Sequence, residues 1–110
     1  MNAEELRDYA LSLKNLTEGF PFGEETLVFK TNAKIFLLVS LSAAPLQFNV
    51  KCDPDVAIEL REQYSCILPG HHMNKKHWNT IIVDGSLTRS QLEKFIMNSY
   101  LLVAKKKTDR

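Results

Sequence analysis

Three segments of the chain carry apolar residues at the three- and four-residue spacing of an amphipathic helix. The first covers about residues 3–16, and the second begins after Asp53-Pro54, an N-cap followed by a proline where no backbone amide is needed. The third covers about residues 89–104 and is preceded by a capping box and a hydrophobic staple. Its expected core positions are Leu92, Phe95, Ile96, Ser99, Tyr100 and Val103.

The segments between these helices have the length and alternation of β-strands. In residues 46–51, Leu46, Phe48 and Val50 alternate with polar residues, so they are expected to point to one face. Further strands are expected at 27–31, 35–39, 66–68 and 78–83. The order α-β-β-β-α-β-β-α predicts a single α+β domain over residues 1–110, with an antiparallel sheet of about five strands and helices packed mainly on one face.

Length and composition indicate an ordinary globular domain. The 110 residues are 45% hydrophobic and 25% charged, which is enough to bury a core without disulfides or metal. No apolar run approaches the roughly 20 residues that cross a bilayer, and the acidic start of the chain is unlike a secretory signal peptide. Cys52 and Cys66 lie in no metal-binding spacing and are expected to be reduced thiols. We therefore expect a cytoplasmic, bacterial-type monomer with no membrane contact.

The net charge of +1 hides an uneven distribution along the chain. Residues 1–25 carry six acidic against two basic residues, whereas residues 71–110 carry eight basic against three acidic residues. Part of this excess lies in a basic C-terminal tail, residues 105–110. A basic C-terminal third suits a polyanionic partner such as DNA, and the small total charge predicts weak, salt-dependent binding.

The segment 69–80 concentrates the polar chemistry of the chain, with all three histidines and the only tryptophan. Pro69-Gly70 predicts a turn, so the segment is interpreted as a surface loop that leads into the last strand. Such a loop can contact phosphates through lysines, a base edge or sugar through amides and imidazoles, and a base through an exposed indole ring. The candidate nucleic-acid-binding residues are Lys75, Lys76, His72, Asn74, His77, Trp78 and Asn79, with Lys30, Lys34 and Lys51 from other segments. The alternatives are a buried Trp78, a merely solvated lysine pair, and a His77 that is hydrogen-bonded within the protein and orders the strand.

Several short motifs occur along the chain: Pro21-Phe22-Gly23, Phe29-Lys30, Lys34-Ile35-Phe36, Lys51-Cys52-Asp53-Pro54, Pro69-Gly70, the segment from His72 to Thr80, and Ser99-Tyr100. With these motifs the sequence resembles the MmcQ/YjbR family over roughly residues 3–104. It departs from the family at Asn32-Ala33, where a glycine often precedes the lysine, and at His71, where an aromatic residue is common. The resemblance implies a CyaY-like fold and a "double wing" DNA-binding domain whose β-hairpins act as wings.

Metal binding and catalysis are less well supported by the residues. His71, His72 and His77 are not joined by a cysteine or a group of carboxylates, and zinc sites need three or four ligands. Cys66 and Asp84 are the candidate partners for a catalytic histidine, but no nucleophile elbow, phosphate loop or paired-acid motif is present. We therefore expect no enzyme activity, no catalytic residue, no metal and no cofactor. The sequence favours a DNA-binding protein that contacts phosphates through the 71–80 loop and basic hairpins, with another protein as the alternative partner of the same loop.

Overall fold

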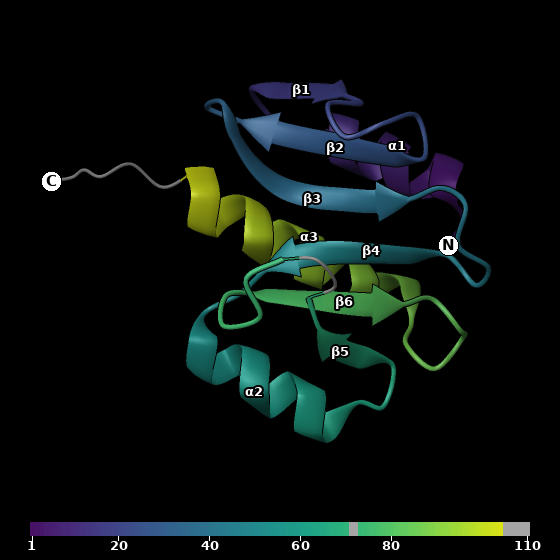
Figure 1. Ribbon diagram of the computed structural model, residues 1–110, viewed down its shortest axis with the longest axis vertical. Coiled ribbons are helices and arrows are strands. Elements are labelled where there is room, and N and C mark those ends of the chain that lie inside the picture. The colour runs from purple at the N-terminus through teal and green to yellow at the C-terminus, as the bar shows by residue number, and fades with distance from the viewer. Residues whose placement is uncertain (71–72, 105–110) are drawn as a thin grey trace, which may run out of the picture.

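The computed structural model describes residues 1–70 and 73–104 and contains one antiparallel sheet with three helices (Figure 1). The elements are α1 (Ala3–Leu11), β1 (Leu16–Gly19), β2 (Thr26–Thr31), β3 (Lys34–Ser40), β4 (Gln47–Lys51), α2 (Pro54–Gln63), β5 (Ile67–Pro69), β6 (Trp78–Ile82) and α3 (Arg89–Ala104). The strands lie in the order β1-β2-β3-β4-β6-β5. The predicted α+β class is confirmed, with six strands rather than about five.

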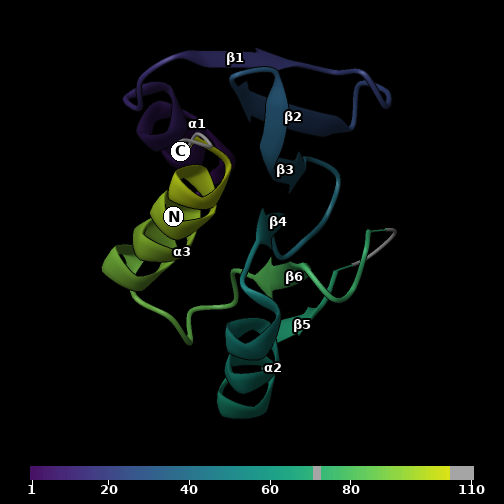
Figure 2. The same ribbon diagram turned by 90° about the vertical axis from the view of Figure 1, so that its left-hand side faces the viewer.

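The helices leave one face of the sheet without a helix. Figure 2 shows α1 and α3 on one side of the sheet, while α2 lies beside the edge formed by β5 and β6. The main core fills the space between the sheet and the helices, where Leu6, Phe36, Phe48 and Ile96 are fully buried. Each such side chain contributes about 1.5–3 kcal/mol by leaving water. We call the other side of the sheet the open face; it presents Val28, Leu38, Asn49 and Thr80, which are paired neighbours on successive strands.

A β-bulge in β3 turns two consecutive large residues toward the helices. Phe29 of β2 pairs with Leu37 of β3, and the next residue, Lys30, pairs with Ile35. Phe36 is therefore left without an opposite residue. Phe36 and Leu37 are both fully buried, whereas strict alternation would send one of them to the open face. The bulge therefore adds one aromatic ring to the main core.

Ser99 and Tyr100 join α3 to the sheet and to the α1–β1 connection. The Ser99 hydroxyl donates to the carbonyl oxygen of Phe36 at 2.6 Å and accepts from the backbone amide of Lys51 at 2.8 Å. The Tyr100 hydroxyl donates to the carbonyl oxygen of Lys14 at 2.8 Å. These bonds give the Ser99-Tyr100 motif a structural role, because they satisfy backbone groups that the β-ladders leave unpaired.

Replacing Ser99 with alanine is expected to lower the free energy of unfolding by about 1–3 kcal/mol, because the part-buried amide of Lys51 and the buried carbonyl of Phe36 lose their partner. Ser90→Ala, at an exposed position in the first turn of the same helix, is the matched control and should change stability by less than about 0.5 kcal/mol. Urea unfolding followed by tryptophan fluorescence measures both variants. Equal effects of the two changes would show that the buried hydroxyl does not stabilise the fold.

The first helix is shorter than the sequence predicts, and an additional strand follows it. The helix ends at Leu11 instead of near residue 16: the amides of Ser12 and Leu13 bond three residues back, to the carbonyl oxygens of Tyr9 and Ala10. Asn15 then adopts a left-handed conformation with φ of +60° immediately before the strand. Residues Leu16–Gly19 then pair with β2 as an edge strand. This strand has one large apolar residue, Leu16, and therefore no alternation of apolar and polar residues by which the sequence could predict a strand. Asn15 was the available signal, since asparagine tolerates left-handed backbone better than most residues.

Candidate nucleic-acid interface

Lysines from distant parts of the sequence gather at one end of the sheet. In an antiparallel sheet the end of one strand lies beside the start of the next, so the ends of β2 and β4 meet the starts of β1, β3 and β6 (Figure 1). Six lysines lie at or next to these strand ends: Lys14, Lys30, Lys34, Lys51, Lys75 and Lys76. We call this set the lysine-rich end.

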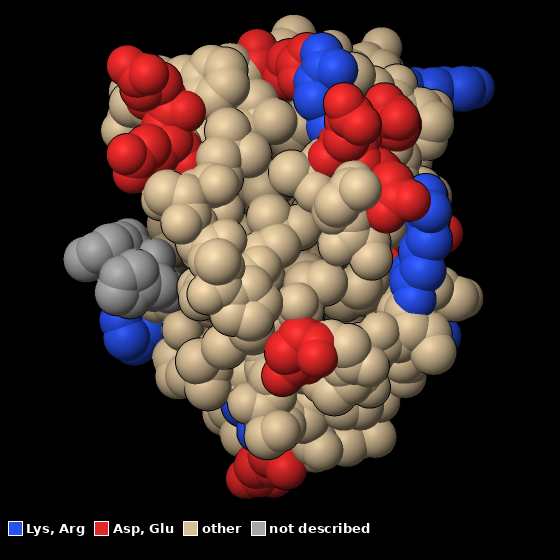
Figure 3. All heavy atoms as spheres, turned by 90° about the vertical axis from the view of Figure 1, so that its right-hand side faces the viewer, with Lys and Arg blue, Asp and Glu red and all other residues tan. Residues whose placement is uncertain are grey.

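Carboxylates are few at the lysine-rich end and numerous at the opposite end. Asp53 and Asp55 lie near the lysines because α2 follows β4 directly, and the Asp53 carboxylate accepts from the amides of Asp55 and Val56 at 3.0 and 3.4 Å as a helix cap. The opposite ends of the strands and the start of α1 carry Glu4, Glu5, Glu18, Glu24, Glu25 and Asp84. Figure 3 views the molecule from that side and shows acidic side chains gathered mainly over its upper half, next to a broad uncharged area. The charge therefore changes sign along the strand direction.

Asn74 organises the loop that carries Lys75 and Lys76. Its side-chain oxygen accepts from the amide of Lys76 at 2.9 Å, and its carbonyl oxygen accepts from the amides of His77 and Trp78 at 3.2 and 3.0 Å. These bonds close a turn in which both lysines are exposed. The Asn74 oxygen is therefore engaged inside the loop and is not presented to a base edge; Asn74 positions the lysines instead.

Gly70 allows the two stems of this loop to lie close together. Its amide donates to the carbonyl oxygen of Trp78 at 2.9 Å. A Cβ atom at Gly70 would lie 2.7 Å from the Cβ atom of Trp78 and 3.2 Å from that of Met73, so a larger residue would push the stems apart. The carbonyl oxygen of His77 accepts from the amide of Cys52 at 2.7 Å, which ties the loop to the end of β4.

Trp78 belongs to a small hydrophobic cluster on the open face. Its side chain is 9% exposed and packs with the buried residues Val28 and Leu38 and the partly buried Ile35 and Met73. A ring with so little free surface cannot serve as a stacking platform for a base. The buried alternative for Trp78 is therefore the one found in the structure, and its place among the nucleic-acid-binding candidates has to be corrected.

Asn79 lies on the helix side of the sheet and not in the candidate interface. Its side chain is 1% exposed, and its Nδ2 donates to the carbonyl oxygen of Ala57 in α2 at 3.3 Å. Alternation along β6 explains this placement, because neighbouring residues point to opposite faces. Asn79 is thus unavailable to a ligand at the lysine-rich end, which corrects its predicted role. His77 is half-buried, whereas His71 and His72 lie outside the described residues.

The β2–β3 hairpin brings Lys30 and Lys34 to the same end as the loop lysines. Its turn residues Asn32 and Ala33 have φ angles of +53° and +64°, as a two-residue hairpin turn requires. The Asn32 side-chain amide donates to the carbonyl oxygen of Ala104 at 3.5 Å, so the hairpin tip lies against the end of α3. The absence of the usual glycine here leaves the turn intact, and the predicted lysines Lys30, Lys34, Lys75 and Lys76 share one end of the sheet.

The described residues offer little reactive chemistry. Burial raises the pKa of the half-buried Cys52 thiol, and the neighbouring Asp53 carboxylate raises it further, so the thiol stays protonated at neutral pH. The Asp84 carboxylate accepts from Ser86, through its amide at 3.0 Å and its hydroxyl at 2.5 Å. Within residues 1–70 and 73–104, no group of three or more histidine, cysteine or acidic side chains is placed to hold a metal ion. No helix in this part of the chain is long and apolar enough to cross a membrane.

The open face also contains a hollow of about 400 Å³ that the sequence did not reveal. Phe22 and Met73 come from loops, and the other lining residues, Thr26, Leu38, Ser40, Gln47, Asn49 and Thr80, come from four strands. No single segment contains a recognisable pattern for such a site. The Pro21-Phe22-Gly23 motif is the one local signal that points to it.

Related proteins are found in several bacteria. The family model YjbR matches residues 11–102 of this chain. The uncharacterised Escherichia coli protein YbdF is 38% identical over 101 residues, which cover 91% of this chain and 82% of YbdF. The uncharacterised Escherichia coli protein YjbR is 29% identical over 100 residues, which cover 91% of this chain and 85% of that protein.

Solved structures share the fold described above. The crystal structure of protein DR2400 from Deinococcus radiodurans, a DUF419 domain, has a TM-score of 0.91 and 37% sequence identity, and the match covers 99% of this chain and 83% of DR2400. A crystal structure of a Pseudomonas syringae protein has a TM-score of 0.80 and 25% identity over 94% of this chain and 99% of that protein. The resemblance inferred from the motifs is thereby confirmed: the chain belongs to the YjbR family.

Proposed function

We propose that this protein is a non-enzymatic DNA-binding protein that contacts phosphates through its lysine-rich end. The observation that carries this proposal is the convergence of six lysines from five segments on one end of the sheet. Phosphate contacts by lysine position a protein on DNA without reading its sequence. Binding of this kind needs a basic surface and no reactive group.

The ion pairs support this assignment. Arg7 forms an ion pair with Glu18 at 2.6 Å, and Arg89 forms ion pairs with Glu5 and Glu93 at 3.3 and 3.1 Å. By contrast, none of the six lysines forms an ion pair with a described residue. A lysine without a carboxylate partner keeps its charge available for a phosphate.

The size of the expected affinity follows from counterion release. Each phosphate neutralised by a lysine adds about 0.9 to the slope of log K against log salt concentration on duplex DNA. The net charge of only +1 limits long-range attraction. We therefore expect sequence-independent binding, with a dissociation constant of about 10⁻⁴–10⁻⁶ M at physiological salt.

The double variant Lys75→Ala/Lys76→Ala tests this proposal. Removing two phosphate contacts should weaken binding to all DNA sequences and lower the salt slope by about one to two. Stability should change by less than about 0.5 kcal/mol, because both side chains are exposed. The measurement is fluorescence anisotropy with labelled DNA at several salt concentrations.

Lys94→Ala is the control, because Lys94 is an exposed lysine of α3 outside the lysine-rich end. It should leave the salt slope unchanged. If wild type binds no more tightly than about millimolar at low salt, which is weaker than ordinary non-specific binding, the proposal fails. It also fails if the double variant behaves like the control.

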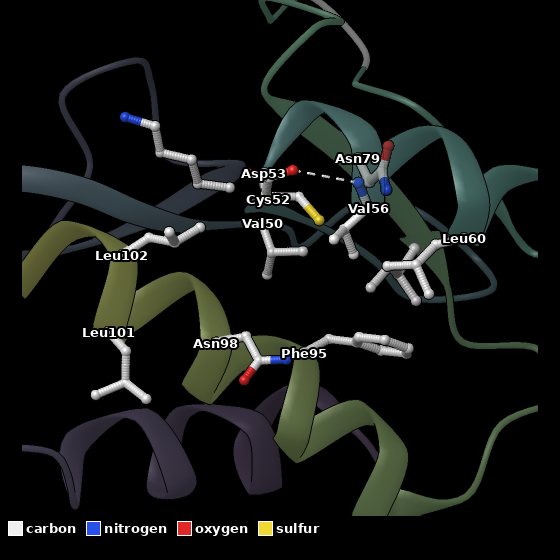
Figure 4. A pocket seen from close by; sticks show the side chains of 12 residues that line it. Val50, Cys52, Asp53, Val56, Leu60, Asn79, Phe95, Asn98, Leu101 and Leu102 are labelled. Atoms are coloured by element: carbon white, nitrogen blue, oxygen red, sulfur yellow. Dashed lines mark hydrogen bonds between the residues drawn. The ribbon is translucent and has the colours of Figure 1, made fainter.

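A groove between α2 and α3 favours a second candidate function, the binding of another protein. The groove has a volume of about 350 Å³ and a mainly apolar lining (Figure 4). Val56, Leu101 and Leu102 line it and are 42%, 54% and 47% exposed, although exposed apolar residues are usually scattered singly. A protein bound there would show little of the salt dependence expected of phosphate contacts.

A further inference from the structure

The hollow on the open face combines a mainly polar floor, in which Leu38 is the apolar member, with two apolar walls. Its floor consists of two cross-strand rows, in which Thr26, Ser40 and Gln47 are paired neighbours and Leu38, Asn49 and Thr80 are paired neighbours. The walls are the side chains of Phe22 and Met73. A volume of about 400 Å³ lies within the range of pockets that hold small ligands.

The floor presents side-chain amides in an orientation that can be assigned. Asn49 Oδ1 accepts from the hydroxyl of Thr80, so its Nδ2 remains as a donor. Gln47 lies two residues earlier on the same face of β4, and its side-chain amide bonds to no described residue. Asn49 therefore offers a donor, and Gln47 offers a donor and an acceptor together, which are the groups that pair with the edge of a nucleobase.

A backbone turn places Phe22 at the rim of the hollow. The Gly23 amide donates to the carbonyl oxygen of Phe20 at 3.3 Å and closes a turn with Pro21 and Phe22 at its centre. Phe22 is 64% exposed, so the packing of its ring in the protein contributes little to stability. An exposed aromatic ring beside a polar floor suits stacking on a base, because every base has a π-face.

The lysine-rich end begins next to the hollow. Lys51 lies two residues beyond Asn49 on β4, a distance of about 7 Å along the strand. On the other side, Glu24 and Glu25 follow Phe22 in the sequence and would repel a phosphate. A bound nucleotide would therefore keep its phosphates at the lysines and turn its base toward the hollow.

We propose that the hollow receives an unpaired base of a single-stranded nucleic acid whose phosphates lie at the lysine-rich end. This inference rests on the function proposed above and narrows its ligand to single strands. A base that is paired and stacked in a duplex must be extruded before it can enter such a pocket, at a cost that a single strand avoids. Counterion release alone would favour the duplex, because its phosphates lie closer together.

The test compares a single-stranded oligonucleotide with the duplex of the same sequence by fluorescence anisotropy at one salt concentration. Wild type should bind the single strand about tenfold or more tightly than the duplex. Phe22→Ala should weaken single-strand binding about 5- to 150-fold, the loss expected for one stacked base, and should leave duplex binding unchanged. Its thermal midpoint should match that of wild type, since the ring is exposed.

Phe20→Ala is the matched control, because Phe20 is 50% exposed in the same connection but does not line the hollow. It should leave the preference for single strands unchanged. Equal affinity for single strand and duplex, or equal effects of Phe22→Ala and Phe20→Ala, would overturn the base-binding proposal while phosphate binding at the lysines still stands. A failure of both oligonucleotides to bind at low salt would overturn both proposals together.

Discussion

Replacing Trp78 with alanine is expected to lower the free energy of unfolding by about 3–5 kcal/mol, the usual loss for a large buried aromatic residue. The indole ring packs with Val28 and Leu38 in the cluster on the open face. The carbonyl oxygen of Trp78 also accepts from the Gly70 amide, at the base of the loop that carries Lys75 and Lys76. A domain of this size has a total stability of about 5–15 kcal/mol, so this loss is a substantial part of it.

Urea unfolding followed by circular dichroism measures this loss, because the variant has no tryptophan fluorescence. Trp78→Phe is the control: it keeps an aromatic ring in the cluster and should be the more stable of the two variants. A loss below about 1 kcal/mol for Trp78→Ala, the range of many surface changes, would mean that the indole ring is not a core residue.

Reversing one charge at the hairpin, with Lys34→Glu, is expected to weaken DNA binding about tenfold or more at 0.1 M salt. One phosphate contact raises the logarithm of the binding constant by about 0.9 when the salt concentration falls from 1 M to 0.1 M. Losing that contact removes this gain, and the new carboxylate adds repulsion. Lys34 is exposed at the start of β3 and makes no ion pair with a described residue, so folding should be unaffected.

The control for this reversal is Lys94→Glu, which changes the net charge by the same amount away from the lysine-rich end. Anisotropy titrations of both variants at the same salt separate a local contact from the effect of total charge. Equal losses of affinity in the two variants would show that only the net charge matters and that the lysine-rich end is not the binding surface.

The parts of the fold that depend on local sequence could be predicted. The last helix lies at Arg89–Ala104, as its capping residues and apolar spacing indicate, and the turn at Asn32 and Ala33 joins the two strands expected there. The bulge at Phe36 could not be predicted, because it depends on the register of β3 against β2. Strand β1 could not be predicted either, because an edge strand with two exposed polar residues has no hydrophobic pattern.

The candidate site could be predicted only in part, because it is assembled from distant segments. The sequence identifies Lys75 and Lys76 as candidates, but only the pairing of β6 with β4 brings their loop beside Lys51. Alternation places Trp78 and Asn79 on opposite faces, and both are buried: Trp78 by the small cluster on the open face and Asn79 against α2. The hollow was missed for a similar reason, since its lining comes from four strands and two loops.

The binding surface itself is best tested by nuclear magnetic resonance, with a single-stranded oligonucleotide titrated into ¹⁵N-labelled protein at low salt. We expect the largest shifts of backbone amide signals at the lysine-rich end, around Lys30, Lys34, Lys75 and Lys76. The amide signals of Glu4 and Glu5 at the acidic end should hardly move. Shifts confined to the groove between α2 and α3, or no shifts at millimolar oligonucleotide, would contradict the proposal that this end of the sheet binds nucleic acid.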